Sequence, residues 1–296
     1  MGDFMDGILL VNKEEGFTSR DMVNKVGNIL GTKKIGHTGT LDPMATGVLV
    51  MCVGKCTKLV DIITSDYKEY VAGVRIGLLT DTLDITGNVI KTGKFDFSRD
   101  EIVDVINSMI GYYDQEVPIY SAVKINGRKL YEYARNNIEV ILPKRRVHVK
   151  DISLVSDISY NSNYIEFSIR CVVSKGTYIR SLIRDISFKL GSVGIMSSLI
   201  RTKQGEFNIT DCYSLKDIES GNYKFYPLID YFSDIRKEMV SEELKKDILN
   251  GKIIDNIYNC DKILFVDSLG GILAIYSLYD KDSSKLKPYK MFGGIK

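Results

Sequence analysis

Apolar and polar residues follow two different periods along this chain. The uninterrupted apolar run GILLVN at 7–12 predicts a buried strand, and so does the apolar run at 48–53. Between them, Thr18 and Asp21 resemble a capping box, and apolar residues recur after them at helical spacing, which predicts a helix. The segment 31–41 is rich in Gly, Thr and Lys and is expected to be a loop.

The middle of the chain continues this mixture of periods. Residues 70–78 alternate between apolar and other side chains, which predicts a strand with one face turned inward. A second capping box begins at Ser98 and is followed by a helical pattern that ends at Gly111. Residues 119–125 resemble a strand, and Asn-Gly at 126–127 is a turn signal.

The last third contains the clearest alternation, at 165–173, followed by a helical pattern that opens at 176–177. Strands and helices mix without a regular βαβ rhythm. This favours an α+β fold with a mixed, mostly antiparallel sheet flanked by helices. A hairpin is expected around Gly270, within a small β-rich module at 237–296 that follows a larger domain at 1–236.

Composition places the chain among globular proteins. It has 296 residues, of which 44% are hydrophobic and 26% charged, so it can bury a substantial core. The longest apolar run is far shorter than a spanning helix, so no membrane association is expected. The opening MGDFMD lacks a signal-peptide pattern, and Asp6 breaks the myristoylation pattern. The sequence therefore predicts a cytoplasmic protein, and the lack of long heptads favours a monomer.

The cysteines do not form a recognisable metal site. Their number, five, is odd, which is typical of reduced thiols in a cytoplasmic protein. Cys52 and Cys56 are separated by three residues and would need distant partners to bind zinc, and the chain has only His37 and His148 as further nitrogen ligands. We therefore expect buried thiols and no metal.

Charge is distributed unevenly along the chain. Residues 120–204 contain 15 Lys and Arg against 6 Asp and Glu, a local charge of +9. Since the whole chain carries +2, the rest carries about −7 (+2 minus +9). Such an asymmetry is typical of a region that binds an acidic partner, with nucleic acid the first candidate. Dispersed surface charge would explain the same count.

The segment 33–49, KKIGHTGTLDPMATGVL, has the densest chemical signal. Its glycines permit close backbone approach to a ligand, and Pro43 restricts Asp42 to an extended backbone. A phosphate loop is excluded because His37 stands where Lys is required. The phosphorylated-aspartate motif of P-type ATPases is excluded because Gly36 occupies the place of its Asp. From the residues alone, Asp42 is either catalytic or an ordinary turn residue.

A resemblance to a known family bears on this choice. Residues 36–49 match the pattern G-H-x-G-x-L-D-P-x-A-x-G-x-L, and the segment resembles the signature of the TruB family of tRNA pseudouridine synthases. The resemblance continues, in the family's order, through the segments 7–19, 66–87, 120–135, 175–185 and 199–207. The related dyskerin branch is less similar, because this chain is short and lacks extended basic tails.

The resemblance implies isomerisation of the T-loop uridine of tRNA (position 55) to pseudouridine. The glycosidic bond breaks, the base rotates and a new carbon–carbon bond forms, without a redox cofactor, nucleotide or metal. Asp42 is implied as the catalytic nucleophile. Whether it attacks C6 or C1′, or abstracts a sugar proton, stays open, as does the group that accepts the C5 proton. The target base is expected to flip out of its stack.

The resemblance also assigns substrate-binding residues. Tyr70 would stack on the flipped base, and Tyr178 and Arg180 would form the pocket wall, with Arg180 paired to Asp42. His37 would stabilise the rearranged RNA loop. Asp81 matches a position near the active site. On the residues alone, Asp81 could equally be a turn residue, and Tyr70 could be an ordinary aromatic residue of a strand.

An RNA-gripping insertion at about 115–150 and a PUA-like RNA-binding module at the C-terminus are implied as well, with the tRNA T stem-loop as partner. The insertion's cations would bind the RNA backbone and its tyrosines could stack on bases. The RNA-binding residues predicted in and before the insertion are Lys33, Lys34, Lys124, Arg128, Lys129, Arg145 and Arg146.

The chain departs from the family in places that concern RNA docking. The family's Q-x-P-P reads QEVP at 115–118, a glycine is replaced at 136–137, and L-R-R-T reads LIRT at 199–202. None of these changes affects Asp42 or Arg180. A non-catalytic tRNA-folding helper that uses the same pocket is the alternative function, and a metal- or nucleotide-dependent enzyme lacks the necessary ligand residues.

Overall fold

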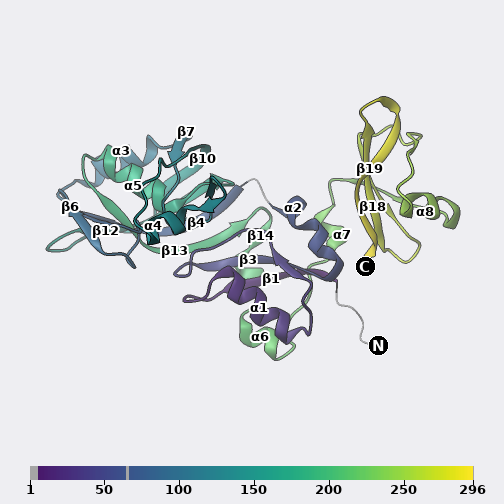
Figure 1. Cartoon of the computed structure of the whole chain (residues 1–296), viewed down its shortest axis with the longest axis horizontal. Coiled ribbons are helices and arrows are strands. Elements are labelled where there is room, and N and C mark those ends of the chain that lie inside the picture. The colour runs from purple at the N-terminus through teal and green to yellow at the C-terminus, as the bar shows by residue number, and fades with distance from the viewer. Residues whose placement is uncertain (1–5, 65–66, 296) are drawn as a thin grey trace.

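The computed structural model describes residues 6–64 and 67–295. Within them a ten-stranded sheet has the central order β1-β3-β13-β4-β12-β10-β7, with β2, β11 and β14 attached beside it. Neighbouring strands of this central path are antiparallel except for β13 against β3. The predicted mixed, mostly antiparallel sheet is therefore confirmed (Figure 1). Its strands are β1 (Gly7–Lys13), β2 (Ile35–His37), β3 (Thr46–Val53), β4 (Tyr67–Ile76), β7 (Gly111–Glu116), β10 (Lys144–Leu154), β11 (Ser159–Tyr160), β12 (Ile165–Ser174), β13 (Gly194–Gln204) and β14 (Phe207–Asn208).

Helices cover the sheet where its strands are most apolar. Both predicted capping boxes are present, at Thr18 before α1 and at Ser98 before α3. One core lies between β4, β12, α3 and α5, and a second lies between β1, β3 and α1. The helices are α1 (Ser19–Ile29), α2 (Val60–Ile63), α3 (Arg99–Asn107), α4 (Leu130–Arg135), α5 (Ile179–Lys189), α6 (Leu215–Glu219), α7 (Leu228–Tyr231) and α8 (Glu242–Leu249), with 3-10 turns η1 (Gly54–Leu59) and η2 (Ile209–Asp211).

Two local predictions were wrong. The expected loop at 31–41 contains β2, which pairs with residues 51–53 of β3. These residues pair with β1 on one edge, and β13 pairs with β3 only at 46–47, so the other edge is available to β2. The expected strand at 119–125 is reduced to β8 (Lys124–Ile125). Pro118 has no amide to donate, and the Tyr120 carbonyl accepts a hydrogen bond from the Arg180 side chain rather than from a neighbouring strand. N-terminal residues 1–5 and Asp66 of the family segment 66–87 lie outside the described residues.

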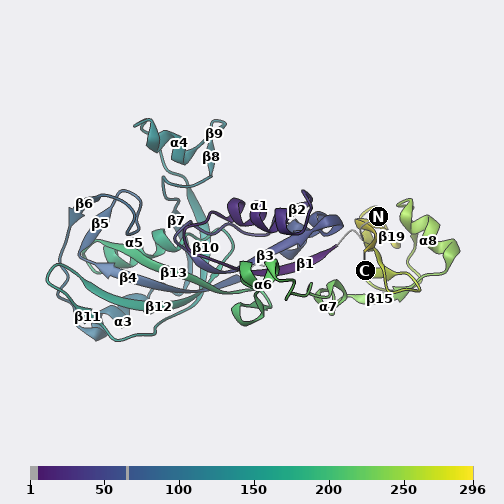
Figure 2. The same cartoon turned by 90° about the horizontal axis from the view of Figure 1, so that it is seen from below.

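The predicted insertion is shorter than 115–150, because both of its ends belong to strands of the main sheet. β7 ends at Glu116 and β10 begins at Lys144. Between them, the hairpin β8–β9 (Arg128–Lys129) and α4 stand away from the sheet (Figure 2). The predicted turn at 126–127 connects the hairpin, with positive φ at both residues. We refer to residues 117–143 as the projection. A further small hairpin pairs β5 (Leu78–Thr80) with β6 (Val89–Thr92).

The C-terminal module is a five-stranded sheet in the order β15-β17-β18-β19-β16. It begins at Arg236, next to the predicted boundary, and contains the expected hairpin between β17 and β18. Its apolar side shares a core with β1, β3 and η1, in which Ile275 and Phe292 lie with Leu59. Its strands are β15 (Arg236–Met239), β16 (Ile254–Asp255), β17 (Lys262–Val266), β18 (Ile272–Tyr279) and β19 (Asp282–Ile295).

Candidate active site

Asp42 lies in the connection between β2 and β3. We call this connection, together with the first two residues of β3, the catalytic loop (residues 38–47). Pro43 keeps Asp42 out of a helical conformation, and the Ala45 amide donates to the Asp42 carbonyl oxygen over 3.0 Å. At the end of the loop, Gly47 has a φ of 102°, and a Cβ there would lie 2.3 Å from the carbonyl oxygen of Arg201. The loop therefore requires glycine where it passes β13.

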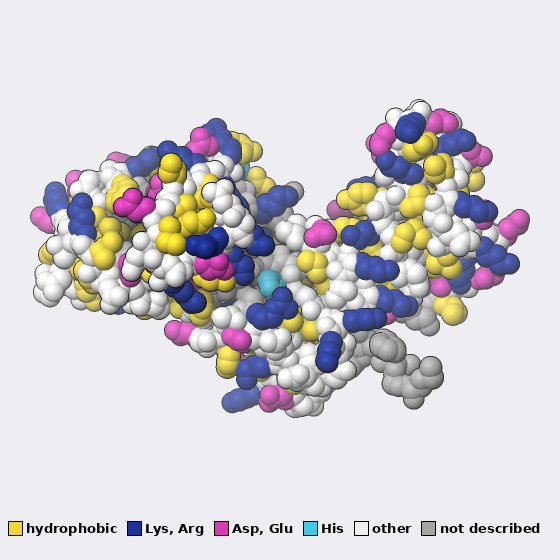
Figure 3. Space-filling model, viewed as in Figure 1, with side chains coloured by type: hydrophobic (Ala, Val, Ile, Leu, Met, Phe, Trp, Pro, Cys, Tyr) yellow, Lys and Arg dark blue, Asp and Glu magenta, His cyan; other side chains and the backbone are white. Residues whose placement is uncertain are grey.

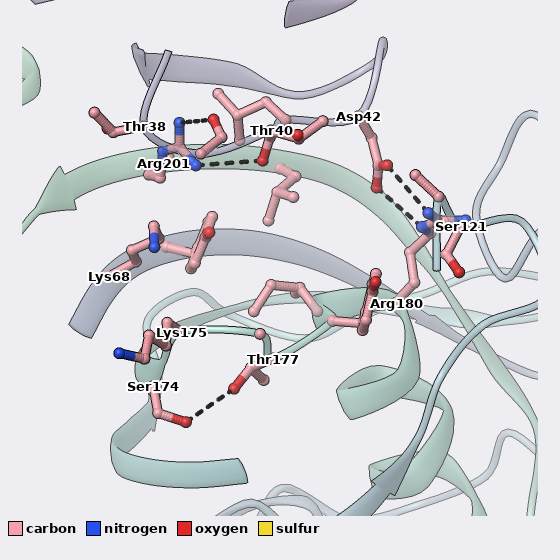
Figure 4. Close-up of a pocket in the computed structure, with 18 of the residues that line it drawn as sticks. Thr38, Thr40, Asp42, Lys68, Ser121, Ser174, Lys175, Thr177, Arg180 and Arg201 are labelled. Atoms are coloured by element: carbon pink, nitrogen blue, oxygen red, sulfur yellow. Dashed lines mark hydrogen bonds and ion pairs between the residues drawn. The ribbon is translucent and has the colours of Figure 1, made fainter. Parts of the chain in front are cut away.

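Arg180 holds the Asp42 carboxylate in a two-point contact (Figure 4). Its Nε lies 2.9 Å from Asp42 Oδ2, and its Nη2 lies 3.0 Å from Oδ1. The Arg180 side chain, from the first turn of α5, is only 6% exposed, whereas that of Asp42 is 33% exposed. A bidentate contact of this kind fixes the plane of the carboxylate as well as its position.

The remaining N–H groups of the guanidinium donate hydrogen bonds to two backbone segments. Arg180 Nη1 donates to the Thr82 carbonyl (3.0 Å), and Nη2 donates to the Tyr120 carbonyl (3.1 Å). Asp84 Oδ2 lies 3.9 Å from Nη1, and its side chain is 8% exposed. Arg180 thus connects Asp42 to the turn after β5 and to the base of the projection.

The second acidic residue near Arg180, besides Asp42, is Asp84, which the sequence analysis did not single out. Asp81, the predicted one, accepts a hydrogen bond from the Asn88 amide (2.9 Å) and lines a neighbouring cavity together with Tyr120. The segment TDTLDIT offers two acids three residues apart, and only the fold shows which one turns inward.

A cavity of about 460 Å³ opens beside the Asp42–Arg180 pair. Its volume is in the range of small-ligand sites, about 300–1,000 Å³. β4, β13, the projection and the segment 174–180 contribute its walls. Four tyrosines line it: Tyr70, Tyr120, Tyr131 and Tyr178. An aromatic cavity with one fixed carboxylate is suited to a planar ring that is attacked or deprotonated at its edge.

Tyr70 projects from β4 into this cavity and is 7% exposed. Burial raises the pKa of its hydroxyl, and the neighbouring Arg201 guanidinium partly offsets that effect. The phenol is therefore neutral at physiological pH. The alternation predicted for β4 placed this residue on the inward face correctly.

Two buried cations support the catalytic loop from opposite sides, and sequence reasoning missed both. Lys13, at the end of β1, is fully buried, and its ammonium donates to the carbonyls of Pro43 (3.0 Å) and Ala45 (2.5 Å). Burial lowers the pKa of Lys13 to about 8, although the nearby Asp42 opposes the shift.

Arg201, on β13, is also fully buried. Its Nε donates to the Val48 carbonyl over 2.7 Å and its Nη2 donates to the Gly39 carbonyl over 3.1 Å. A longer contact, 3.4 Å, joins Nη1 to the Thr40 carbonyl (Figure 4). The loop carbonyls thus receive hydrogen bonds from side chains of the two strands that flank β3.

Tyr178 is the residue before α5, and its backbone is held by a buried glutamine. Gln115 accepts a hydrogen bond from the Tyr178 amide (2.7 Å) and donates one to the Tyr178 carbonyl (3.1 Å). Gln115 is 1% exposed. This pair of bonds fixes the start of the helix that carries Arg180.

Known proteins resemble this chain over nearly its whole length. Residues 27–179 match the N-terminal domain of TruB family pseudouridylate synthases. The chain belongs to the TruB family. It is 42% identical to proteins named tRNA pseudouridine synthase B from Staphylococcus aureus strains Newman and USA300, over 97% of this chain and 99% of theirs. It is therefore a pseudouridine-forming isomerase.

Solved structures share the fold of this TruB family member. A Cbf5-Nop10-Gar1 complex superposes with a TM-score of 0.66 at 22% identity, over 98% of this chain and 84% of the other. An H/ACA RNP bound to a substrate RNA containing 2'-deoxyuridine superposes with a TM-score of 0.67 at 21% identity, over 97% and 84%. The catalytic and C-terminal parts are thus both present in these neighbours.

The predicted RNA-binding cations of the TruB family chain lie on its surface. Lys33 and Lys34 precede β2, and Lys124, Arg128 and Lys129 lie on the hairpin of the projection. Arg145 and Arg146 lie on β10 instead of in the projection. Lys and Arg side chains are also numerous around the hollow in the centre of the molecule (Figure 3).

His37 lies on β2 and does not line the catalytic cavity. Among the described residues, its Nδ1 is buried without a hydrogen-bond partner. Burial lowers its pKa, and the nearby charges of Arg20 and Arg201 add to the effect. The imidazole beside the catalytic loop is therefore neutral, and its unpartnered nitrogen is enclosed by the protein.

The cysteines are dispersed in the cores, as expected of ordinary thiols. Cys52, Cys56 and Cys171 are buried, and burial raises the pKa of each to about 12. No group of three or more His, Cys, Asp or Glu side chains in residues 6–64 and 67–295 is arranged to hold a metal ion.

Proposed function

We propose that this chain converts a uridine in the T loop of tRNA, at position 55, to pseudouridine. The observation that carries the proposal is the Asp42 carboxylate, fixed by Arg180 beside a cavity of nucleoside size. The name of the Staphylococcus relatives, which align over nearly the full length of this chain, supports tRNA as the substrate. The resemblance of residues 36–49 to the signature of the TruB family implies the T-loop site.

In this proposal the target uridine leaves its stack and enters the cavity, since its N1–C1′ bond is inaccessible within the loop. Asp42 is the catalytic residue, whether it attacks C6 or C1′ or removes a sugar proton. Tyr70 stacks on the base, and Tyr178 forms the wall around it. Arg180 keeps the carboxylate aimed while the base rotates, because its own contacts are made to protein backbone.

The rest of the RNA would be held by surfaces around the cavity. His37, adjacent to the catalytic loop and only half-buried, would contact the rearranged RNA loop through the exposed part of its ring. The cations of the projection and of β10 would neutralise phosphates, which predicts binding that weakens as salt rises. The C-terminal sheet would act as a PUA-like module on the acceptor side of the tRNA. Asp81 stays a candidate for substrate binding through the neighbouring cavity.

Release of tritium from tRNA labelled at uridine C5 tests the proposal, because the reaction must expel that hydrogen. Wild-type protein should release it, and Asp42→Asn should bind the same tRNA without releasing it. A transcript with cytidine at the T-loop position should give no release at that site. Tight binding without release by wild type would instead support the non-catalytic tRNA-folding role, and release by both proteins would mean that another residue starts the reaction.

We further propose that the protein acts as a cytoplasmic monomer. None of the described helices is long and apolar enough to cross a membrane. Light scattering after gel filtration should give a mass near 33.4 kDa. A mass of twice that value would contradict the monomer.

A further inference from the structure

A stacked aromatic pair lies on the side of the main sheet that faces away from α3 and α5. His148 on β10 is directly opposite Tyr112 on β7. Side chains of opposite residues in an antiparallel pair are close neighbours. Here the two rings stack, with centroids 4.1 Å apart and planes 17° apart. Tyr112 is 65% exposed, so much of its ring is accessible to a ligand.

This pair is not needed to fill the core. The neighbours of His148 on β10, Val147 and Val149, turn to the opposite side and are buried. His148 is nevertheless fixed, because its Nδ1 lies 2.8 Å from the Tyr67 hydroxyl and its amide donates to Ser174 Oγ over 2.9 Å. The rings therefore form a preorganised platform at the surface.

Cations surround the platform. The Arg146 guanidinium lies 5.8 Å from the centroid of the Tyr112 ring, and the Lys150 ammonium lies 5.3 Å from that of Tyr67. Asp114 lies 3.5 Å from Arg146, but both side chains are about 60% exposed. This distance and exposure leave the guanidinium accessible to a second anion, since exposed ion pairs are weak.

The platform adjoins the catalytic cavity. Tyr112, His148 and Arg146 line a separate depression of about 310 Å³. Ser174 and Lys175 line this depression and also the catalytic cavity. A chain-like ligand that leaves the catalytic cavity over the 174–175 edge therefore enters the depression directly.

We propose that this depression is an accessory RNA site that holds one unpaired nucleotide of the substrate. The base stacks on Tyr112, and a neighbouring phosphate lies against Arg146. Base–aromatic stacking and guanidinium–phosphate contacts are the interactions that bind single-stranded nucleic acid. An acidic peptide would use the cations but not the open aromatic ring. The inference rests on RNA as the substrate of the proposed function.

The test is the affinity of tRNA for four variants, measured by fluorescence anisotropy with a labelled transcript. Tyr112→Ala should raise Kd by about five- to tenfold, as expected for the loss of one stacked base. Tyr112→Phe should bind as wild type does. Arg146→Gln should reduce the slope of log Kd against log salt by about one, as for one lost phosphate contact. Tyr160→Ala is the control, since Tyr160 is similarly exposed at 60% on the same sheet.

If Tyr112→Ala binds tRNA as tightly as Tyr160→Ala, the accessory site is refuted. Tritium release by wild type in the same preparations separates the two proposals. Release with unchanged affinities would overturn this inference alone, whereas no release would overturn the proposed T-loop reaction.

Discussion

Replacing Arg201 with methionine is the sharpest test of how the catalytic loop is held. The substitution keeps an unbranched side chain of similar length but removes every donor. Arg201 does not touch Asp42; it acts through the carbonyls of Gly39 and Val48. The expected consequence is a catalytic loop that is less well positioned in a protein that still folds.

The magnitude follows from the contacts. Two of the three hydrogen bonds are short, and each buried carbonyl that loses its donor costs about 1–3 kcal/mol. Removing a buried charge recovers part of its desolvation, and the Gly39 carbonyl borders the cavity, where water can replace the donor. We therefore expect the free energy of unfolding to fall by about 2–4 kcal/mol. A misplacement of about 1 Å at the reacting group would slow turnover by about a hundredfold.

The assay is tritium release under single-turnover conditions, at a temperature where circular dichroism shows the variant to be folded. Turnover should fall while the Kd for tRNA stays within a few-fold, since Arg201 is fully buried. Arg201→Lys should recover part of the rate. Arg170→Met is the matched control, because Arg170 contacts Glu69 and Asp151 outside the cavity. Near-normal turnover by folded Arg201→Met, or an equal loss in the control, would refute the reasoning.

Three further predictions concern the same region and the core. Lys13→Met should destabilise the protein by about 1–3 kcal/mol and slow turnover, measured by urea unfolding and tritium release. Gly47→Ala should prevent stable folding, because its Cβ would overlap the Arg201 carbonyl. Gly16 also has a positive φ, 86°, but open space around it, so Gly16→Ala should remain folded in the same unfolding assay. Cys171, whose pKa burial raises to about 12, should resist iodoacetamide at pH 8 until urea is added, as read by mass spectrometry.

The sequence predicted the sheet well where one face is buried. The alternation at 165–173 became β12, whose residues are alternately buried and half-buried. The capping boxes fixed the starts of α1 and α3, because their hydrogen bonds are local. The segment 119–125 is also rich in apolar residues, but only 124–125 pair with another strand. The rest lies along the cavity, where Tyr120 bonds to Arg180, and this contact with a residue distant in sequence leaves no local pattern.

The candidate site was predictable only in part, for a similar reason. Asp42 stands in a motif of contiguous residues, whereas Arg201 lies in a strand where a charged side chain is normally assumed to face solvent. Lys13 follows an apolar run, and a lysine at the end of a strand is likewise normally assumed to extend into solvent. Asp84 and Asp81 differ only in which of them the turn directs toward Arg180. Each of these assignments depends on residues that are distant in sequence.

These distant residues explain how a partly exposed carboxylate can be held rigidly. A loop has few backbone hydrogen bonds of its own, and its buried carbonyls must still be satisfied. Lys13 from β1 and Arg201 from β13 provide the donors on either side of the catalytic loop, and Arg180 from α5 provides the third contact at Asp42 itself. The orientation of Asp42 is therefore set by three elements of the folded core.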